Sequence, residues 1–159
     1  MSDTLRTGLW IGALTVLWML VMGYTGWYLH PVLLNLFFLV IVIEAVLISR
    51  ALCRSAATNT YVQQVVAGTT MAVVASIVVF CGSYVFTTVL FPTYFQDLQR
   101  VGRGVMARQG LPDAEITQRL GAMAPWQTPV MNALQGVIGT VLTGLVASLI
   151  VGAFSRKRA

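Results

Sequence analysis

Three long stretches of the chain contain no Asp, Glu, Lys or Arg, and they constrain the fold more than any other feature. They run from Thr7 to Ile43, from Ser55 to Gln96 and from Leu120 to Ser155. A helix that crosses the hydrocarbon core of a bilayer needs about 20 apolar residues, so the first stretch can hold one helix and part of a second. Because lipid offers the backbone no hydrogen-bond partners, apolar segments of this length must be helical. The sequence therefore predicts an all-α, polytopic membrane protein.

The composition agrees with a chain whose main apolar solvent is lipid. Hydrophobic residues make up 57% of the sequence and charged residues only 9%, whereas about a quarter of the residues are charged in soluble domains. We expect a single membrane domain over residues 1–159, with four transmembrane helices at about 7–28, 32–53, 62–90 and 130–154. A cleaved signal peptide is the alternative for the first helix, but the apolar run continues through aromatic residues without a clear small-residue cleavage site.

The only sizeable polar segment lies between the third and fourth helices, from Thr93 to Gln127. Its apolar residues recur at helical spacing, at Tyr94, Leu98, Val101 and Val105. Gly110 predicts the end of this helix, and Pro112 with the acids after it predicts the first turn of a second one, in which Glu115 and Arg119 form an ion pair. We expect an amphipathic helical hairpin that lies on the membrane or caps the bundle, with a solvated loop as the alternative.

Basic residues indicate the orientation of the chain. Six of them flank predicted helix ends, namely Arg6, Arg50, Arg54, Arg156, Lys157 and Arg158. Because basic residues near helix ends favour the cytoplasmic side, we expect both termini in the cytoplasm. The same positions account for most of the net charge of +5, so we expect membrane lipid and not nucleic acid as the partner.

Glu44 is the sharpest chemical feature, because it lies slightly past the middle of the second predicted helix. A carboxylate at that depth costs a few kcal/mol, so it should be neutral, paired, or directed toward protein or water. One reading is a proton-binding or cation-binding group or a contact with a partner subunit. The other is a structural glutamate that is hydrogen-bonded to a neighbouring helix. The candidate partners are Thr15, Ser83, Tyr84 and Thr143.

Small residues recur every four positions on three of the predicted helices. The set comprises Gly8 and Gly12, then Gly68, Ala72 and Ser76, then Gly136, Thr140, Gly144, Ser148 and Gly152. Small side chains let helices approach closely in lipid, where no hydrophobic drive between helices remains. These faces predict close helix packing, either within the four-helix bundle or between subunits.

No catalytic or metal-binding pattern accompanies these features. His30, the single histidine, lies beside Pro31 without a nearby Cys, Asp or Glu, so we expect no metal ion and no cofactor. The serines lack a histidine base at a recognisable spacing. Cys53 and Cys81 are too unfavourably placed for a disulfide between them and are interpreted as packing residues. The sequence therefore predicts no catalytic residue and no enzyme.

The second half of the chain resembles a known family. Four motifs follow one another in it. They are a helix that opens with Tyr61-Val62-Gln63-Gln64, a helix end at Phe91-Pro92-Thr93-Tyr94, a helical segment at Gly110-Leu111-Pro112-Asp113, and the run from Val146 to Phe154 before a basic tail. This order resembles the bacterial membrane family catalogued as domain of unknown function 4199, with the best match from Tyr61 to Arg158. The resemblance implies a small four-helix protein of the bacterial inner membrane and implies no catalytic residue or substrate.

Two functional hypotheses follow. The favoured one is a non-enzymatic membrane protein that acts by helix–helix association, as an accessory or scaffolding subunit or as a homo-oligomer. The alternative is a small transporter or channel in which Glu44 binds a proton or cation inside the membrane. A membrane enzyme ranks third.

Overall fold

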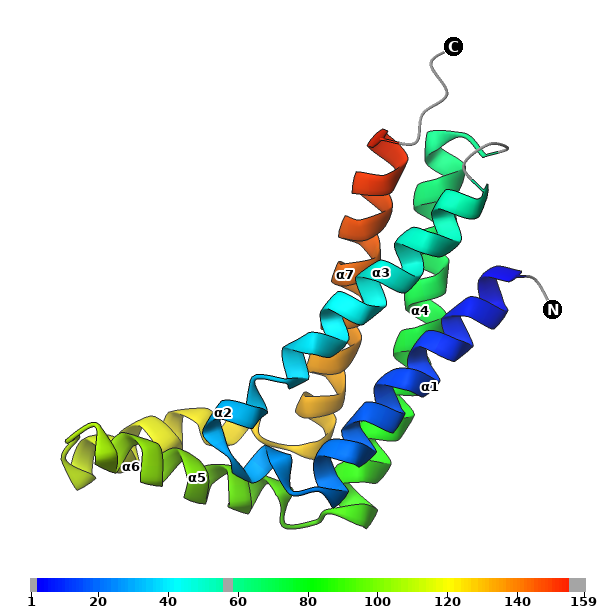
Figure 1. Cartoon of the computed structure of the whole chain (residues 1–159). Coiled ribbons are helices and arrows are strands. Elements are labelled where there is room, and N and C mark those ends of the chain that lie inside the picture. Colours follow the sequence, from blue (N-terminus) through cyan, green and yellow to red (C-terminus); the bar gives the residue numbers. More distant parts are fainter. Residues whose placement is uncertain (1–2, 56–58, 155–159) are drawn as a thin grey trace.

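The computed structural model describes residues 3–55 and 59–154, and it confirms the all-α, four-span architecture. Within these residues every regular element is a helix (Figure 1). The elements are α1 (Asp3–Tyr24), the 3-10 turn η1 (Trp27–Leu29), α2 (Pro31–Leu34), α3 (Phe37–Ser55), α4 (Tyr61–Val85), the π-helix η2 (Phe86–Leu90), α5 (Tyr94–Arg108), α6 (Asp113–Met123), the 3-10 turn η3 (Ala124–Trp126) and α7 (Pro129–Phe154). The basic tail, Arg156 to Arg158, lies outside the described residues.

Local sequence signals account for several helix ends. Thr60 and Gln63 form a reciprocal capping box at the start of α4, and Pro31 occupies the first turn of α2. After α1 ends, Gly26 adopts a left-handed conformation at φ 68°, which glycine tolerates without steric cost. The first helix therefore ends at Tyr24 and not at Tyr28 as expected, and Tyr28 lies in η1.

The second and third spans are less regular than the sequence predicted. The expected continuous helix 32–53 is interrupted at Asn35–Leu36, where successive backbone bonds of the i to i−3 type connect α2 to α3. The third span ends in η2, whose wider turn lets the Phe91 N–H reach the Phe86 carbonyl oxygen at 2.8 Å. Both irregular segments lie at the same end of the bundle, where the chain turns toward α5 (Figure 1). We call this the arm end, and the opposite end, where α1 begins and α7 ends, the terminal end.

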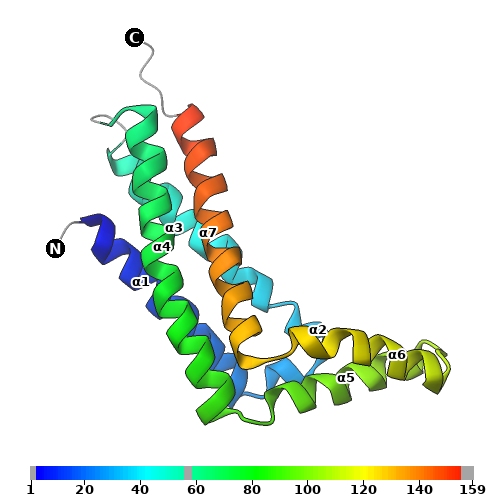
Figure 2. The same ribbon diagram turned by 180° about the vertical axis from the view of Figure 1, so that it is seen from behind.

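Helix α4 is the centre of the bundle. It packs along α1 on one side and along α7 on the other, while α3 leans obliquely across α7 and also contacts α4 and α1 (Figures 1 and 2). The buried apolar core lies toward the terminal end, and it comprises Ile11, Ile48, Leu52, Met71, Ala72, Ala75 and Ala147. Many large apolar side chains elsewhere on the spans are exposed, as suits contact with lipid.

Glycines bring α1 close to α4. A Cβ atom added to Gly8 would lie 2.6 Å from the Met71 carbonyl oxygen, and one added to Gly12 would lie 2.8 Å from the Ala75 carbonyl oxygen. Real Cβ atoms do not approach this closely, so only glycine permits the observed separation. The predicted small-residue face of the first helix is thus turned into the bundle.

The small residues of α4 and α7 face each other in the same way. A Cβ at Gly144 would overlap the Cβ of Ala72, and one at Gly68 would lie 2.6 Å from the Ser148 Cβ. The remaining predicted positions also lie within the chain. Gly136 faces Val79, Gly152 faces the Tyr61 ring, Ser76 is buried with its hydroxyl bonded to the Val73 carbonyl, and Thr140 is bonded to Glu44. The stripes therefore pack within the four-helix bundle.

The segment between α4 and α7 forms the expected helical hairpin. Gly110 ends α5 in a left-handed conformation at φ 79°, and Ile116 and Leu120 of α6 are buried. Glu115 and Arg119 form the predicted ion pair at 2.6 Å. The hairpin extends sideways from the bundle, so the molecule is L-shaped (Figures 1 and 2). We call α5, α6 and their connection the arm.

The contact between Gly144 and Ala72 generates a stability prediction. Gly144→Leu should lower the free energy of unfolding by about 1–3 kcal/mol, because overpacking must separate α4 from α7. The matched control is Gly139→Leu on the same helix, where an added Cβ meets no atom within 4 Å. Thermal unfolding of both variants in one detergent measures the difference. Equal losses of stability would contradict the close-packing account.

Candidate functional site

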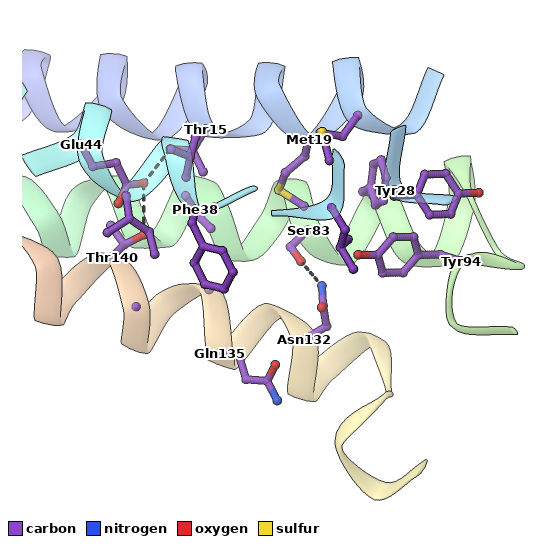
Figure 3. A pocket seen from close by; sticks show the side chains of 18 of the residues that line it. Thr15, Met19, Tyr28, Phe38, Glu44, Ser83, Tyr94, Asn132, Gln135 and Thr140 are labelled. Atoms are coloured by element: carbon purple, nitrogen blue, oxygen red, sulfur yellow. Dashed lines mark hydrogen bonds between the residues drawn. The ribbon is translucent and has the colours of Figure 1, made fainter. Parts of the chain in front are cut away.

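A cavity of about 380 Å³ lies in the half of the bundle nearer the arm end (Figure 3). All four spans contribute to its wall. Its lining residues are Thr15, Met19, Met22, Tyr28, Leu34, Asn35, Phe38, Val40, Ile41, Glu44, Val79, Ser83, Phe86, Tyr94, Asn132, Gln135, Gly136, Gly139 and Thr140. Apolar walls with a few convergent polar groups are typical of small-molecule sites.

Glu44 lies at the end of this cavity that is farther from Tyr28 and Tyr94 (Figure 3). Its side chain is only 3% exposed, and its Oε1 atom is 2.7 Å from the Thr15 hydroxyl oxygen and 3.3 Å from the Thr140 hydroxyl oxygen. Thr15 was one of the predicted partners. The α7 partner, however, is Thr140 and not Thr143, because the rotation of α7 that brings Gly144 to Ala72 also turns Thr140 toward α3.

The hydrogen atoms around Glu44 are limited in number. The Thr15 hydroxyl has two acceptors in reach, the Glu44 carboxyl oxygen and the Ile11 carbonyl oxygen at 3.0 Å, but it carries one hydrogen. If that hydrogen bonds to Ile11, the short contact with Glu44 requires a proton on the carboxyl group. The arrangement thus accommodates both a protonated Glu44 and, after the Thr15 hydroxyl rotates, an ionised one.

Further polar side chains line the middle of the cavity. The Asn132 amide nitrogen donates to the Ser83 hydroxyl oxygen at 2.8 Å and joins α7 to α4. Gln135 lies one turn further along α7, and Asn35 lies at the interruption between α2 and α3. The sequence analysis did not single out these amides. Their signal was present, since Asn132 and Gln135 are the amide side chains within the apolar run of the last helix.

Aromatic rings line the cavity toward the arm. Tyr28 and Tyr94 have ring centroids 5.2 Å apart, and Phe86 packs edge-on against Tyr94 at 5.4 Å. The Tyr28 hydroxyl donates to Asp97 at 3.3 Å, which connects the ring cluster to α5. Burial raises the pKa of Tyr94 to about 12 and, with the nearby Asp97 carboxylate, raises the pKa of Tyr28. Both phenols are therefore neutral at physiological pH.

The other candidate groups lie apart from this site. His30 is exposed in the turn before α2, and the described residues contain no cluster of three or more His, Cys, Asp or Glu side chains suited to a metal ion. Cys53 and Cys81 are free and exposed, so the interpretation of them as packing residues was wrong: both lie on outward faces of their helices.

Comparison with known proteins identifies the family. The family described as "Protein of unknown function (DUF4199)" matches residues 6–157. The chain belongs to the DUF4199 family. No curated protein and no solved structure matches the chain.

The DUF4199 match is broader than the resemblance in the second half suggested. It includes the first two spans and therefore Glu44, Thr15 and every other residue that lines the cavity. The match confirms the family and assigns no activity to it.

The bond between Thr140 and Glu44 can be tested by a double-mutant cycle. Thr140→Val should cost about 0.5–1.5 kcal/mol of stability, because a buried hydrogen bond is lost while the volume is conserved. In a Glu44→Leu background the same substitution should cost nearly nothing. Thr143→Val is the matched control and should have little effect in either background. Equal costs of Thr140→Val in both backgrounds would refute the coupling.

Proposed function

We propose that this DUF4199 protein is a non-enzymatic small transporter or carrier in which Glu44 binds a proton or cation inside the membrane. The observation that carries the proposal is the position of Glu44 on the wall of a cavity, 3% exposed and bonded to two hydroxyl groups from other helices. A carboxyl group at this depth is costly, and such groups commonly mark proton or ion pathways.

The charge balance around Glu44 supports the proposal. None of the described residues that line the cavity is Lys, Arg or His, so the lining supplies no cation to the carboxylate. Its charge must then be neutralised by a proton or by a cation that arrives from outside the chain. A carboxylate that takes its neutralising proton or cation from outside the chain is suited to binding and releasing that ion.

A carrier is favoured over a channel by the packing beyond Glu44. Toward the terminal end, Gly144 and Gly68 of facing helices leave no room for side chains, and Ile48 and Leu52 are fully buried. A dense terminal half beside an open arm half suits a site that is reached from one side at a time.

The titration of Glu44 tests this function. In the infrared spectrum of the protein in nanodiscs, we expect a carbonyl band of a protonated buried carboxyl group that disappears as the pH is raised. Glu44→Gln should abolish this band, whereas Glu115→Gln, which removes an exposed carboxylate from the arm, should leave it unchanged. A Glu44→Gln protein that keeps the whole band would sink the proposal.

Association is the second candidate function, as an accessory or scaffolding subunit or as a homo-oligomer. The observation that favours it is the arm, which extends away from the bundle (Figure 2) and exposes Met123 (47%) at its end, beside Trp126 (62%) in the following turn η3. Aromatic residues and Met are enriched in protein interfaces. The small-residue stripes are occupied within the bundle, so a partner would use the arm instead.

The mass of the assembly in native nanodiscs tests the association. A homo-oligomer or a complex with another membrane protein should exceed the mass of one chain, and Trp126→Ala with Met123→Ala should shift it toward the monomer. Val146→Ala, on a lipid-facing part of α7, is the matched control and should change nothing. A monomer that purifies alone from mild detergent would oppose this candidate.

We also propose that the protein lies in the bacterial inner membrane with both termini in the cytoplasm and the arm outside. The support is the clustering of Arg6, Arg50 and Arg54 toward the terminal end, since basic residues favour the cytoplasmic side. Lipid is then the immediate partner of the spans. Labelling of Cys53 by an impermeant maleimide in intact cells would contradict this orientation, because Cys53 lies near the terminal end of α3.

A further inference from the structure

The lining of the cavity is exposed on one side only. The residues from α1 and α4 are buried: Met19 is 6% exposed, Met22 3% and Val79 3%. On the opposite side, Phe38 of α3 is 64% exposed and Gln135 of α7 is also exposed. The cavity therefore opens through the seam between α3 and α7, and α1 and α4 form its floor.

The seam between α3 and α7 is closed at its end nearer the terminal half and open toward the arm end. The bond between Glu44 and Thr140 ties α3 to α7 at the end nearer the terminal half. Toward the arm end, the next residues of α7 that line the cavity are Gly139 and Gly136, which carry no side chain to fill the gap. A Cβ atom at Gly139 would meet nothing within 4 Å, so the space beside it is free.

The open part of the seam lies at the depth of lipid. Gln135 and Gly139 are within the candidate membrane span Pro129–Phe154, one turn or more from its start. Toward the arm end the cavity is lined by the packed aromatic rings of Tyr28, Phe86 and Tyr94. A ligand that enters through the seam would therefore reach Glu44 from the lipid.

The chemistry of the lining selects a class of ligand. Glu44 offers a negative charge without a cation of its own, and Phe38 adds an aromatic ring, a group that attracts ammonium ions, to the lining. The remaining walls are mostly apolar, and a volume of about 380 Å³ is at the small end of ligand sites. A small apolar molecule with one ammonium group meets all of these conditions.

We propose that the cavity binds a lipophilic ammonium ion, which enters from the membrane through the seam between α3 and α7 and displaces the proton of Glu44. The inference rests on the proposed function of Glu44. In the exchange, the O–H bond of the carboxyl group breaks, the proton leaves to solvent, and the carboxylate forms an ion pair with the ammonium nitrogen. Net charge is conserved and no electron is transferred.

The exchange makes binding dependent on pH. One proton is released for each cation bound, so the affinity should rise about tenfold per pH unit while Glu44 is protonated in the free protein. The other titratable groups near the cavity are Tyr28 and Tyr94 at its arm end, with Asp97 bonded to Tyr28. Both phenols are neutral in this range. Within the described residues, Glu44 is hydrogen-bonded to the hydroxyl groups of Thr15 and Thr140, which do not titrate, so these groups do not alter the pH dependence of binding.

Equilibrium dialysis of the protein in nanodiscs tests the ligand class. The probe is benzyltrimethylammonium, and its uncharged isostere neopentylbenzene is the matched control ligand. For the wild-type protein we expect saturable binding of the cation, with an affinity that rises with pH. In Glu44→Gln the affinity should be at least tenfold lower and should no longer depend on pH. Glu115→Gln should bind the cation as the wild type does. Equal binding of the neutral isostere, or no saturable binding of the cation, would overturn the proposal.

Gly139→Leu tests the route and the cavity independently of Glu44. Its side chain should fill the seam and weaken cation binding at least tenfold, while the thermal stability and the infrared band of Glu44 stay unchanged. Wild-type affinity in this variant would refute the seam as the route. A carboxyl band that persists in Glu44→Gln would instead refute the proposed function, so the two failures can be told apart.

Discussion

The close approach of α4 to its two neighbours, α1 and α7, sets the positions of the other helices. Lipid removes the hydrophobic drive between helices, so contact must come from packing. Gly8 and Gly12 bring α1 against α4, and Gly144 brings α7 against Ala72 from the other side. With α1, α4 and α7 fixed in this way, α3 occupies the remaining position and leans across α7 (Figure 1).

The same constraint creates the cavity. Helix α3 packs tightly only toward the terminal end, where Ile48 and Leu52 enter the core. Toward the arm end its path is broken at Asn35–Leu36, and α7 contributes Gly136 and Gly139, which have no side chains, to the cavity wall. Glu44 lies where the dense half meets the open half, so a single carboxyl group serves both as a bridge between helices and as part of a cavity wall. A structural and a binding role for Glu44 are therefore compatible.

The arm is stabilised differently from the bundle, because its helices are amphipathic and carry charged residues. Its helices place apolar side chains between each other and carry charged residues outside, including the exposed ion pair of Glu115 and Arg119. Such amphipathic helices suit a membrane interface, where one face meets apolar material and the other meets water. The arm contacts the bundle through Tyr28, Tyr94 and Asp97, and the two tyrosines also line the cavity. Movement of the arm would therefore displace the tyrosine rings at the arm end of the cavity.

Four spans, the helical hairpin, the DUF4199 family and one carboxyl group within a span could all be predicted from the sequence. These follow from hydropathy, charge and turn residues, which act over a few residues. Three features became visible only in the folded molecule. Glu44 is bonded to Thr15 and Thr140, which are 29 and 96 residues away in the sequence, the small-residue stripes face inward, and a cavity remains between the helices. Hydropathy is nearly the same all round a helix in lipid, so the rotation of each helix is set by packing against its neighbours.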